Sequence, residues 1–171
     1  MIPYRIGHGY DVHQTAPGLT LTVGGMVIPC EFGLVAHSDG DVLAHAVIDA
    51  LFGAAGMTDI GAHFPDTDPA YKGADSMMLL SECVRLLHED DFEIVNIDAT
   101  VIAQKPKMKP YIQSMRETMA KACGISPDLV NVKATTEEHL GFTGSGEGIA
   151  AHAVCLIEKN DPYPRVNRGT G

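Results

Sequence analysis

Hydrophobic and polar positions divide the chain into segments of two kinds. Residues 4–12 and 19–29 predict strands, and Gly24-Gly25 interrupts the second one in a way that is typical of a hairpin or a bulge. Residues 39–56 carry apolar side chains at helical spacing, with Asp39 as the expected N-cap and Gly56 at the end. Later segments repeat both patterns, with helices expected at 75–90 and 108–123 and strands at 93–103, 129–136 and 148–158.

Two stretches show neither the spacing typical of helices nor that typical of strands. Residues 57–74 contain two prolines, two glycines and three aspartates, which predicts a loop. A loop of this length inside a small domain favours a functional role over mere connection. Residues 159–171 predict an extended tail after a single domain of residues 1–158, and we assign the tail no role.

The order of these elements mixes strands and helices without regular alternation. That order predicts an α+β fold, a single domain with a mixed sheet and helices packed on one face. The later strands are apolar enough to need cover on their other face as well. We therefore expect an oligomer in which the sheets face inward.

Composition narrows the classes of partner and the compartment. Twelve basic against twenty-two acidic residues give a net charge of −10, which argues against a nucleic-acid or membrane-surface binder. An acidic protein that binds a phosphorylated substrate needs a local source of positive charge, such as a metal ion. The four cysteines form no C-x-x-C pair, and the chain has neither a signal-like N-terminus nor an apolar run of membrane-spanning length. We expect a cytoplasmic protein with free thiols.

The sharpest local pattern is Asp11-Val12-His13, because residues two apart in a strand point to the same face. His45 lies in the expected helix, one turn after Asp41. Two ligands from a strand and one from a helix would make a three-ligand site with an open fourth position, the catalytic pattern for zinc. A D-x-H triplet also arises often by chance, so the spacing alone leaves metal binding open.

Five segments together resemble one known family. They are IGHGYDVH, AHSDGDVLAHA, DIGAHFPDTDPAYKGADS, IAQKPKM and VKATTEEHLGFTGSGEGIA, in order and at matching spacings over residues 4–158. The family is that of the 2-C-methyl-D-erythritol 2,4-cyclodiphosphate synthases of the non-mevalonate isoprenoid pathway. The resemblance implies a compact α+β subunit, a homotrimer with active sites between neighbouring subunits, and zinc held by Asp11, His13 and His45.

The reaction implied by the resemblance is intramolecular. The 2-phosphate of 4-diphosphocytidyl-2-C-methyl-D-erythritol 2-phosphate attacks the β-phosphorus of its own diphosphate, and CMP leaves. Catalysis of this kind is mainly positioning and charge stabilisation. Zinc would serve as Lewis acid and template rather than as a source of hydroxide.

The resemblance also implies roles for single residues. His37 and Thr136 match positions that stabilise the transition state, and Glu138 matches a ligand of a magnesium or manganese ion that bridges the α- and β-phosphates. The segment around Lys107 matches the cytidine pocket, and the residues near Asp59 match the part that grips the methylerythritol. The positions that match substrate contacts are Ser38, Asp59, Gly61, Phe64, Asp66, Ala103, Lys107, Met108, Thr135 and Phe142.

Three departures from the family pattern stand out. Ser145 replaces a common arginine that, with the phenylalanine matched by Phe142, lines a cavity able to hold an isoprenoid diphosphate. Without the guanidinium, we expect weak binding of such ligands or none. Glu137 replaces a common threonine and adds negative charge, and His63 stands where relatives often have an apolar residue.

Two other functions remain open at this point. A zinc phosphodiesterase or pyrophosphatase could use the same triad, with Asp39 or Asp41 as general base. A metal-stapled oligomeric binding module would bind zinc without turnover. The product separates these functions, because only cyclisation yields a cyclic diphosphate and CMP.

Overall fold

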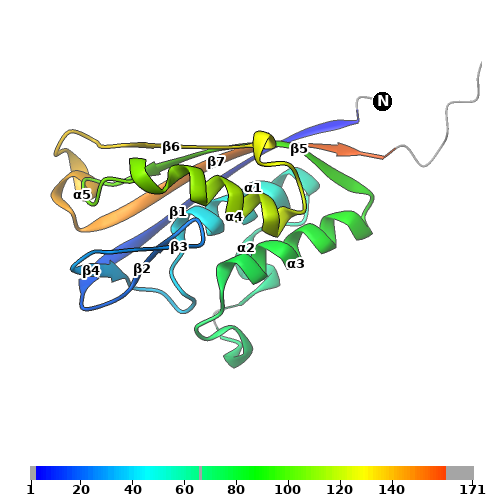
Figure 1. Cartoon of the computed structure of the whole chain (residues 1–171). Helices are drawn as coiled ribbons and strands as arrows, with labels where there is room; N and C mark the ends of the chain where they lie inside the picture. The colour runs from blue at the N-terminus through cyan, green and yellow to red at the C-terminus, as the bar shows by residue number, and fades with distance from the viewer. Residues whose placement is uncertain (1–2, 66, 161–171) are drawn as a thin grey trace, which may run out of the picture.

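The computed structural model describes residues 3–65 and 67–160. Its centre is a five-stranded mixed sheet in the order β4-β1-β7-β5-β6 (Figure 1). Strand β7 pairs antiparallel with both β1 and β5, whereas β5 and β6 are parallel. The strands are β1 (Tyr4–Pro17), β4 (Phe32–Leu34), β5 (Phe92–Ile102), β6 (Val130–Thr135) and β7 (Gly148–Lys159).

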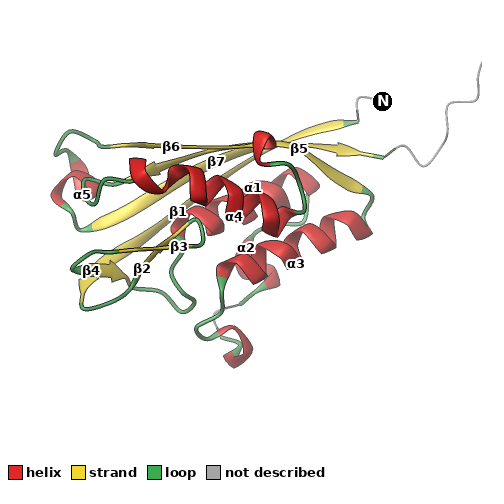
Figure 2. Cartoon of the chain, in the orientation of Figure 1, coloured by secondary structure: helices red, strands yellow, loops and turns green. Residues whose placement is uncertain are grey.

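Three longer helices lie on one side of this sheet (Figures 1 and 2). They are α1 (Val42–Ala55), α3 (Ser76–Glu89) and α4 (Ile112–Cys123). Short turns complete the fold: α2 (Ile60–His63), α5 (Gly141–Ser145), and the 3-10 turns η1 (Pro69–Tyr71), η2 (Lys109–Tyr111) and η3 (Pro127–Leu129). The predicted single α+β domain with a mixed sheet is confirmed. Over residues 3–65 and 67–160, no helix has the length and apolar character needed to cross a bilayer.

Helix α1 is the central element of the core, since it is buried on nearly every side between the sheet and α3. Strand β1 approaches it very closely. A Cβ atom at Gly7 would lie 1.8 Å from the carbonyl oxygen of Ala50, and one at Gly9 would lie 1.8 Å from that of Ala46. Only glycine allows this approach, which brings the next residues of β1 beside the N-terminal turns of α1.

The predicted ends of the helices are mostly confirmed, but the N-cap of α1 is not Asp39. Asp41 caps this helix by accepting a hydrogen bond from the backbone N–H of Ala44 at 3.0 Å. The carboxylate of Asp39 instead bonds Ser76 at the start of α3, so a long-range contact decides between two plausible caps. Gly56 ends α1 in the left-handed region with φ 77°, as the sequence predicts.

The expected interruption at Gly24-Gly25 is the turn of a hairpin between β2 (Leu21–Val23) and β3 (Met26–Ile28). Both glycines have positive φ, 59° and 75°. Their N–H groups donate to the carboxylate of Asp41 at 2.8 and 2.6 Å. Asp41 is fully buried and therefore ties the hairpin to the start of α1.

The loop predicted over 57–74 is only partly confirmed, because the short turns α2 and η1 lie within it. Each is capped by an aspartate: Asp59 accepts from the N–H of Ala62 at 2.9 Å, and Asp68 accepts from that of Ala70 at 2.9 Å. The strand β4 and helix α5 were also not predicted.

The chain end and the outer sheet face complete the description. Lys159, which we assigned to the tail, pairs with Phe92 as the last residue of β7, and residues 161–171 lie outside the described residues.

The sheet face away from the helices exposes apolar side chains of β1 and β7. Ile6 is 75% exposed, and Tyr10, Val12 and Val154 are each more than two-fifths exposed.

Candidate metal centre and active site

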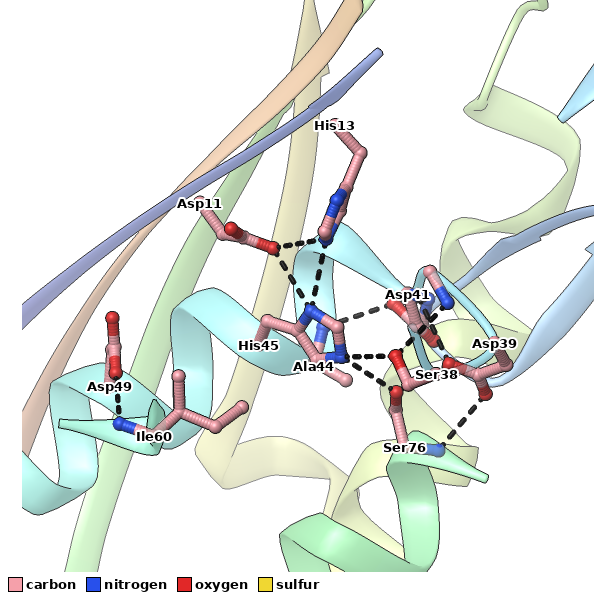
Figure 3. A network of polar contacts seen from close by, with 12 residues as sticks. Asp11, His13, Ser38, Asp39, Asp41, Ala44, His45, Asp49, Ile60 and Ser76 are labelled. Atoms are coloured by element: carbon pink, nitrogen blue, oxygen red, sulfur yellow. Dashed lines mark hydrogen bonds and ion pairs between the residues drawn. The ribbon is translucent and has the colours of Figure 1, made fainter. Parts of the chain in front are cut away.

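Asp11 and His13 of β1 point toward His45 of α1, as the strand–helix argument predicts (Figure 3). The Oδ2 of Asp11 lies 2.8 Å from Nε2 of His13 and 3.0 Å from Nδ1 of His45. The two imidazole nitrogens are 3.1 Å apart. Three potential ligand atoms thus form a nearly equilateral triangle, and the three residues are a candidate metal site.

This triangle fits a tetrahedral ion. Bonds of about 2.0–2.1 Å to nitrogen and oxygen imply ligand atoms about 3.3 Å apart, so only a small outward movement of the side chains would admit zinc. Two imidazoles with one carboxylate suit zinc better than the harder magnesium ion. His45 is 8% exposed, whereas Asp11 and His13 are half-buried at the edge of a hollow.

The electrostatics of the metal-free triad follow from its contacts. Burial by itself would raise the pKa of Asp11, but hydrogen bonds with His13 and His45 outweigh it and lower the pKa to about 2. Burial alone would lower the pKa of His45, because it disfavours the charged ring, but the hydrogen bond and the charge of Asp11 raise this pKa above its usual value. Asp11 is therefore ionised at neutral pH, and a metal must displace any proton held on Nδ1 of His45.

A hollow of about 330 Å³ opens beside the triad. His37, Ser38, Gly61 and Phe64, all predicted site residues, line it together with the three candidate ligands. The Nε2 atom of His37 is buried yet has no hydrogen-bond partner among the described residues. Such an atom is suited to bind a ligand that enters the hollow.

Asp59, predicted from the same loop, is not among the residues that line this hollow. Asp59 lies at the N-cap of α2, where its carboxylate accepts a hydrogen bond from the N–H of Ala62; Gly61 lies within this helix and Phe64 directly follows it. Asp66 lies outside the described residues. The α2 turn is itself held against α1, because Asp49 accepts a hydrogen bond from the N–H of Ile60 at 2.7 Å.

The predicted cytidine-contacting residues lie together in a second hollow of about 420 Å³. Ala103, Lys107 and Met108 line it from the end of β5 and the following turn, and Thr135 and Thr136 from the end of β6. The parallel pairing of β5 and β6 brings these segments together. The two hollows share no lining residue.

Glu138 and Thr136 lie in one turn after β6. The Thr136 hydroxyl donates to Oε1 of Glu138 at 2.7 Å; Glu138 is exposed and Thr136 is half-buried. Glu138 and His139 both have positive φ, 53° and 65°. A non-glycine pair in the left-handed region costs free energy, which is typical of a turn held for function.

The three departures have distinct surroundings. Phe142 and Ser145 line a further hollow, of about 520 Å³, where the Ser145 hydroxyl donates to Glu147 at 2.9 Å. The carboxylate of Glu137 accepts a short hydrogen bond from the buried hydroxyl of Thr143. His63 stacks on Phe52 of α1 at 4.0 Å between ring centroids and contacts the Met57 carbonyl at 2.8 Å, so it anchors the α2 turn.

Sequence reasoning missed several residues that shape the site. Tyr71 and Leu79 line the first hollow, and Ser76 contacts the ring of His45. Asp39 was considered only as a cap or a base, although it holds Ser76. The only signal for Ser76 was its place at the start of a predicted helix, which does not reveal a partner more than thirty residues away.

Comparison with known proteins finds one matching family and relatives that are similar over nearly the whole chain. The model of the YgbB family matches residues 4–158. A protein of Trichlorobacter lovleyi named 2-C-methyl-D-erythritol 2,4-cyclodiphosphate synthase is 62% identical over 153 residues, 90% of this chain and 98% of that protein.

Solved structures agree. The bifunctional IspDF from Campylobacter jejuni matches at 43% identity and a TM-score of 0.90, over 94% of this chain and 44% of that longer one. IspF from Plasmodium falciparum, in complex with CDP, matches at 32% identity and a TM-score of 0.81, over 94% of this chain and 99% of that one.

Proposed function

The chain belongs to the YgbB family, and from that membership we propose that it performs the reaction for which its relatives are named. It converts 4-diphosphocytidyl-2-C-methyl-D-erythritol 2-phosphate to 2-C-methyl-D-erythritol 2,4-cyclodiphosphate and CMP, a step of isoprenoid precursor biosynthesis. The observation that carries the proposal is 62% identity along 98% of a relative named for this activity. The convergence of Asp11, His13 and His45 beside an open hollow supports it.

The chemistry is an exchange of one phosphoryl bond for another. An oxygen of the 2-phosphate forms a bond to the β-phosphorus, the bond from that phosphorus to the bridging oxygen breaks, and CMP leaves with the bridging oxygen. No water enters. The protein must bend a flexible substrate so that its ends meet, and positioning of this kind can contribute about 7–11 kcal/mol.

We propose zinc as the ion at Asp11, His13 and His45, because the donor set and the size of the triangle fit it. When bound, the ion supplies a Lewis acid for the β-phosphate and neutralises its charge. We propose magnesium or manganese at Glu138, whose hard carboxylate oxygens are exposed after β6. Two cations would offset locally the net charge of −10.

The remaining residues fall into three proposed roles. His37, whose buried Nε2 has no partner among the described residues, and the hydroxyl of the half-buried Thr136 donate hydrogen bonds to the developing phosphoryl charge. Ser38 contacts the phosphates beside them. The groups proposed to hold the methylerythritol are Asp59, Gly61, Phe64 and Asp66, and those for the cytidine end are Ala103, Lys107 and Met108. Thr135 is proposed to lie near the diphosphate, and Phe142 lines the separate hollow beside Ser145.

The separation of the two hollows supports a homotrimer with shared active sites. The triad and the cytidine-side residues line different hollows of one chain, and a site that uses both would be completed where neighbouring chains bring them together. The outer sheet face, with Ile6, Tyr10, Val12 and Val154 exposed, offers an apolar surface for such contacts. The free thiols of all four cysteines suit the reducing cytoplasm.

Neither of the two general bases considered for the rival phosphodiesterase, Asp39 and Asp41, is free to act near the triad. Asp41 is fully buried, and its carboxylate oxygens accept three backbone hydrogen bonds. Asp39 is engaged by both the N–H and the hydroxyl of Ser76. No observation favours the binding module over an enzyme.

Phosphorus NMR of the products, with and without a chelator, tests the proposed function. The parent chain should yield a cyclic diphosphate and CMP, and activity should disappear with chelator and return with zinc. His45→Ala should lose both zinc and turnover. The matched control is His88→Ala on the surface of α3, which should behave like the parent. A linear monophosphate as product would refute the proposal, and parental turnover by His45→Ala would refute the ligand assignment.

A further inference from the structure

The ring of His45 is contacted at both of its nitrogens (Figure 3). Its Nδ1 atom faces Asp11 and His13, as a metal ligand must. Its Nε2 atom lies between two hydroxyl groups, 2.9 Å from Oγ of Ser76 and 3.1 Å from Oγ of Ser38. The contacts of Nε2 decide which nitrogen of a neutral ring carries the proton.

The direction of the hydrogen bonds on the Ser76 side is determined by Asp39. An ionised carboxylate only accepts, and Asp39 accepts from the Ser76 N–H at 2.9 Å and from the Ser76 hydroxyl at 2.5 Å. Since a hydroxyl has one proton, Ser76 gives it to Asp39 and presents a lone pair to His45. The ring must then donate from Nε2, which leaves the lone pair of Nδ1 for the metal.

Ser38 differs from Ser76 in burial and in its other contacts. Ser76 is completely buried, whereas Ser38 lines the hollow beside the triad. The Ser38 oxygen already accepts from the N–H of Gly40 at 3.2 Å, and no carboxylate among residues 3–65 and 67–160 accepts its proton. The Nε2–H group of His45 can donate well to only one of the two hydroxyl oxygens. Ser76 is the better acceptor, because it lies closer and its own proton is already donated to Asp39.

We propose that Asp39 and Ser76 are positioning residues that hold His45 with its proton on Nε2 and its Nδ1 lone pair directed at the metal, so that the Ser38 hydroxyl stays free for substrate. The inference rests on the proposed function only in that a metal occupies the triad. Partners that orient a metal-bound histidine typically contribute a factor of about 10–100 to metal affinity.

Zinc affinity of the full chain, measured by competition with a chromophoric chelator, tests the proposal. Ser76→Ala should weaken zinc binding about 10–100-fold. Ser38→Ala should leave zinc affinity nearly unchanged but raise KM for the cytidylylated substrate. The matched control is Ser81→Ala on the same helix, whose hydroxyl bonds backbone carbonyls of Met77 and Ala122 and should not affect zinc. Parental affinity in Ser76→Ala, or an equal loss in Ser38→Ala, would overturn the assignment.

A second measurement begins with the parent chain itself. Nitrogen-15 NMR of the zinc-loaded parent should show a slowly exchanging proton on Nε2 of His45, and this proton should exchange faster in Ser76→Ala. If the Nε2 proton of His45 exchanged as fast as that of a fully exposed histidine, the proposed role of Asp39 and Ser76 would be wrong. The two proposals fail separately. If the parent binds zinc but forms no cyclic product, the proposed function is wrong and the role of Asp39 and Ser76 still stands. If the parent forms cyclic product but Ser76→Ala binds zinc as tightly as the parent, only the role of Asp39 and Ser76 is wrong.

Discussion

Substitution of Gly9 by alanine should damage both the fold and the metal site, because β1 can lie against α1 only without a side chain there. The added Cβ would lie 1.8 Å from the carbonyl oxygen of Ala46 and 2.7 Å from the amide nitrogen of Ala50. Ordinary contact begins at 3.4 Å, so the strand would have to retreat by 3.4 − 1.8 = 1.6 Å or distort. Both contacted atoms belong to the backbone of α1 and cannot turn away.

The expected cost follows from this overlap. Overpacked cores lose about 1–3 kcal/mol, and a clash with backbone places Gly9→Ala at about 3 kcal/mol of unfolding free energy. The shift also moves Asp11 and His13, two and four residues further along the strand, away from His45. Metal sites tolerate about 0.2 Å in bond length, so zinc affinity should fall at least about tenfold.

Urea unfolding in chelator and zinc competition measure the two effects, and Gly53→Ala is the matched control. Gly53 lies in α1 itself, but a Cβ there would meet nothing closer than the His8 carbonyl oxygen at 3.9 Å. This control should gain about 0.5–1 kcal/mol, because alanine is the better helix former. If Gly9→Ala were as stable as the parent and bound zinc equally well, the close approach of β1 and α1 would not be what positions the ligands.

Four further outcomes follow from the structure. The raised pKa of His45 stabilises the metal-free chain below about pH 6.5, and this stabilisation is lost as pH rises through the folded-state pKa. Zinc affinity should rise over the same interval, because His45 loses its extra proton. Urea unfolding and zinc competition, each measured against pH, should therefore show opposite slopes. Asp41→Ala leaves three backbone donors without their acceptor and should cost about 3 kcal/mol or more in urea unfolding; a loss under 1 kcal/mol would contradict its capping role. Thr136→Val should lower kcat about 10²–10³-fold with unchanged zinc affinity in steady-state kinetics and metal competition; parental kcat would remove it from catalysis. Calorimetry with geranyl diphosphate should show no micromolar binding, given Ser145, and micromolar binding would refute that expectation.

Much of the fold could be predicted because its longer elements carry their own periodicity and stop signals. The helices ending at Gly56 and Gly124 and the hairpin at Gly24-Gly25 follow from glycine in the left-handed region. The metal triad could be proposed because Asp11 and His13 alternate on a strand and His45 lies on a buried helix. That proposal gained force from the five segments that resemble one family.

The rest depends on contacts that local patterns do not encode. Strand β4 and helices α2 and α5 are each five residues or fewer, too short for a period to be recognised. Asp39 and Asp41 are equally good caps by residue type, and only the hairpin glycines and Ser76, distant in sequence, assign one to each role. The separation of the triad from the cytidine-side hollow likewise depends on the arrangement of β1, β5 and β6 in space.

Turnover in water enriched in oxygen-18, followed by mass spectrometry of both products, tests most directly whether the reaction is an intramolecular transfer. Attack by the substrate's own phosphate predicts that neither CMP nor the cyclic diphosphate contains oxygen from the solvent. One solvent oxygen in either product would show that water is the nucleophile, and the proposed cyclisation would then be wrong.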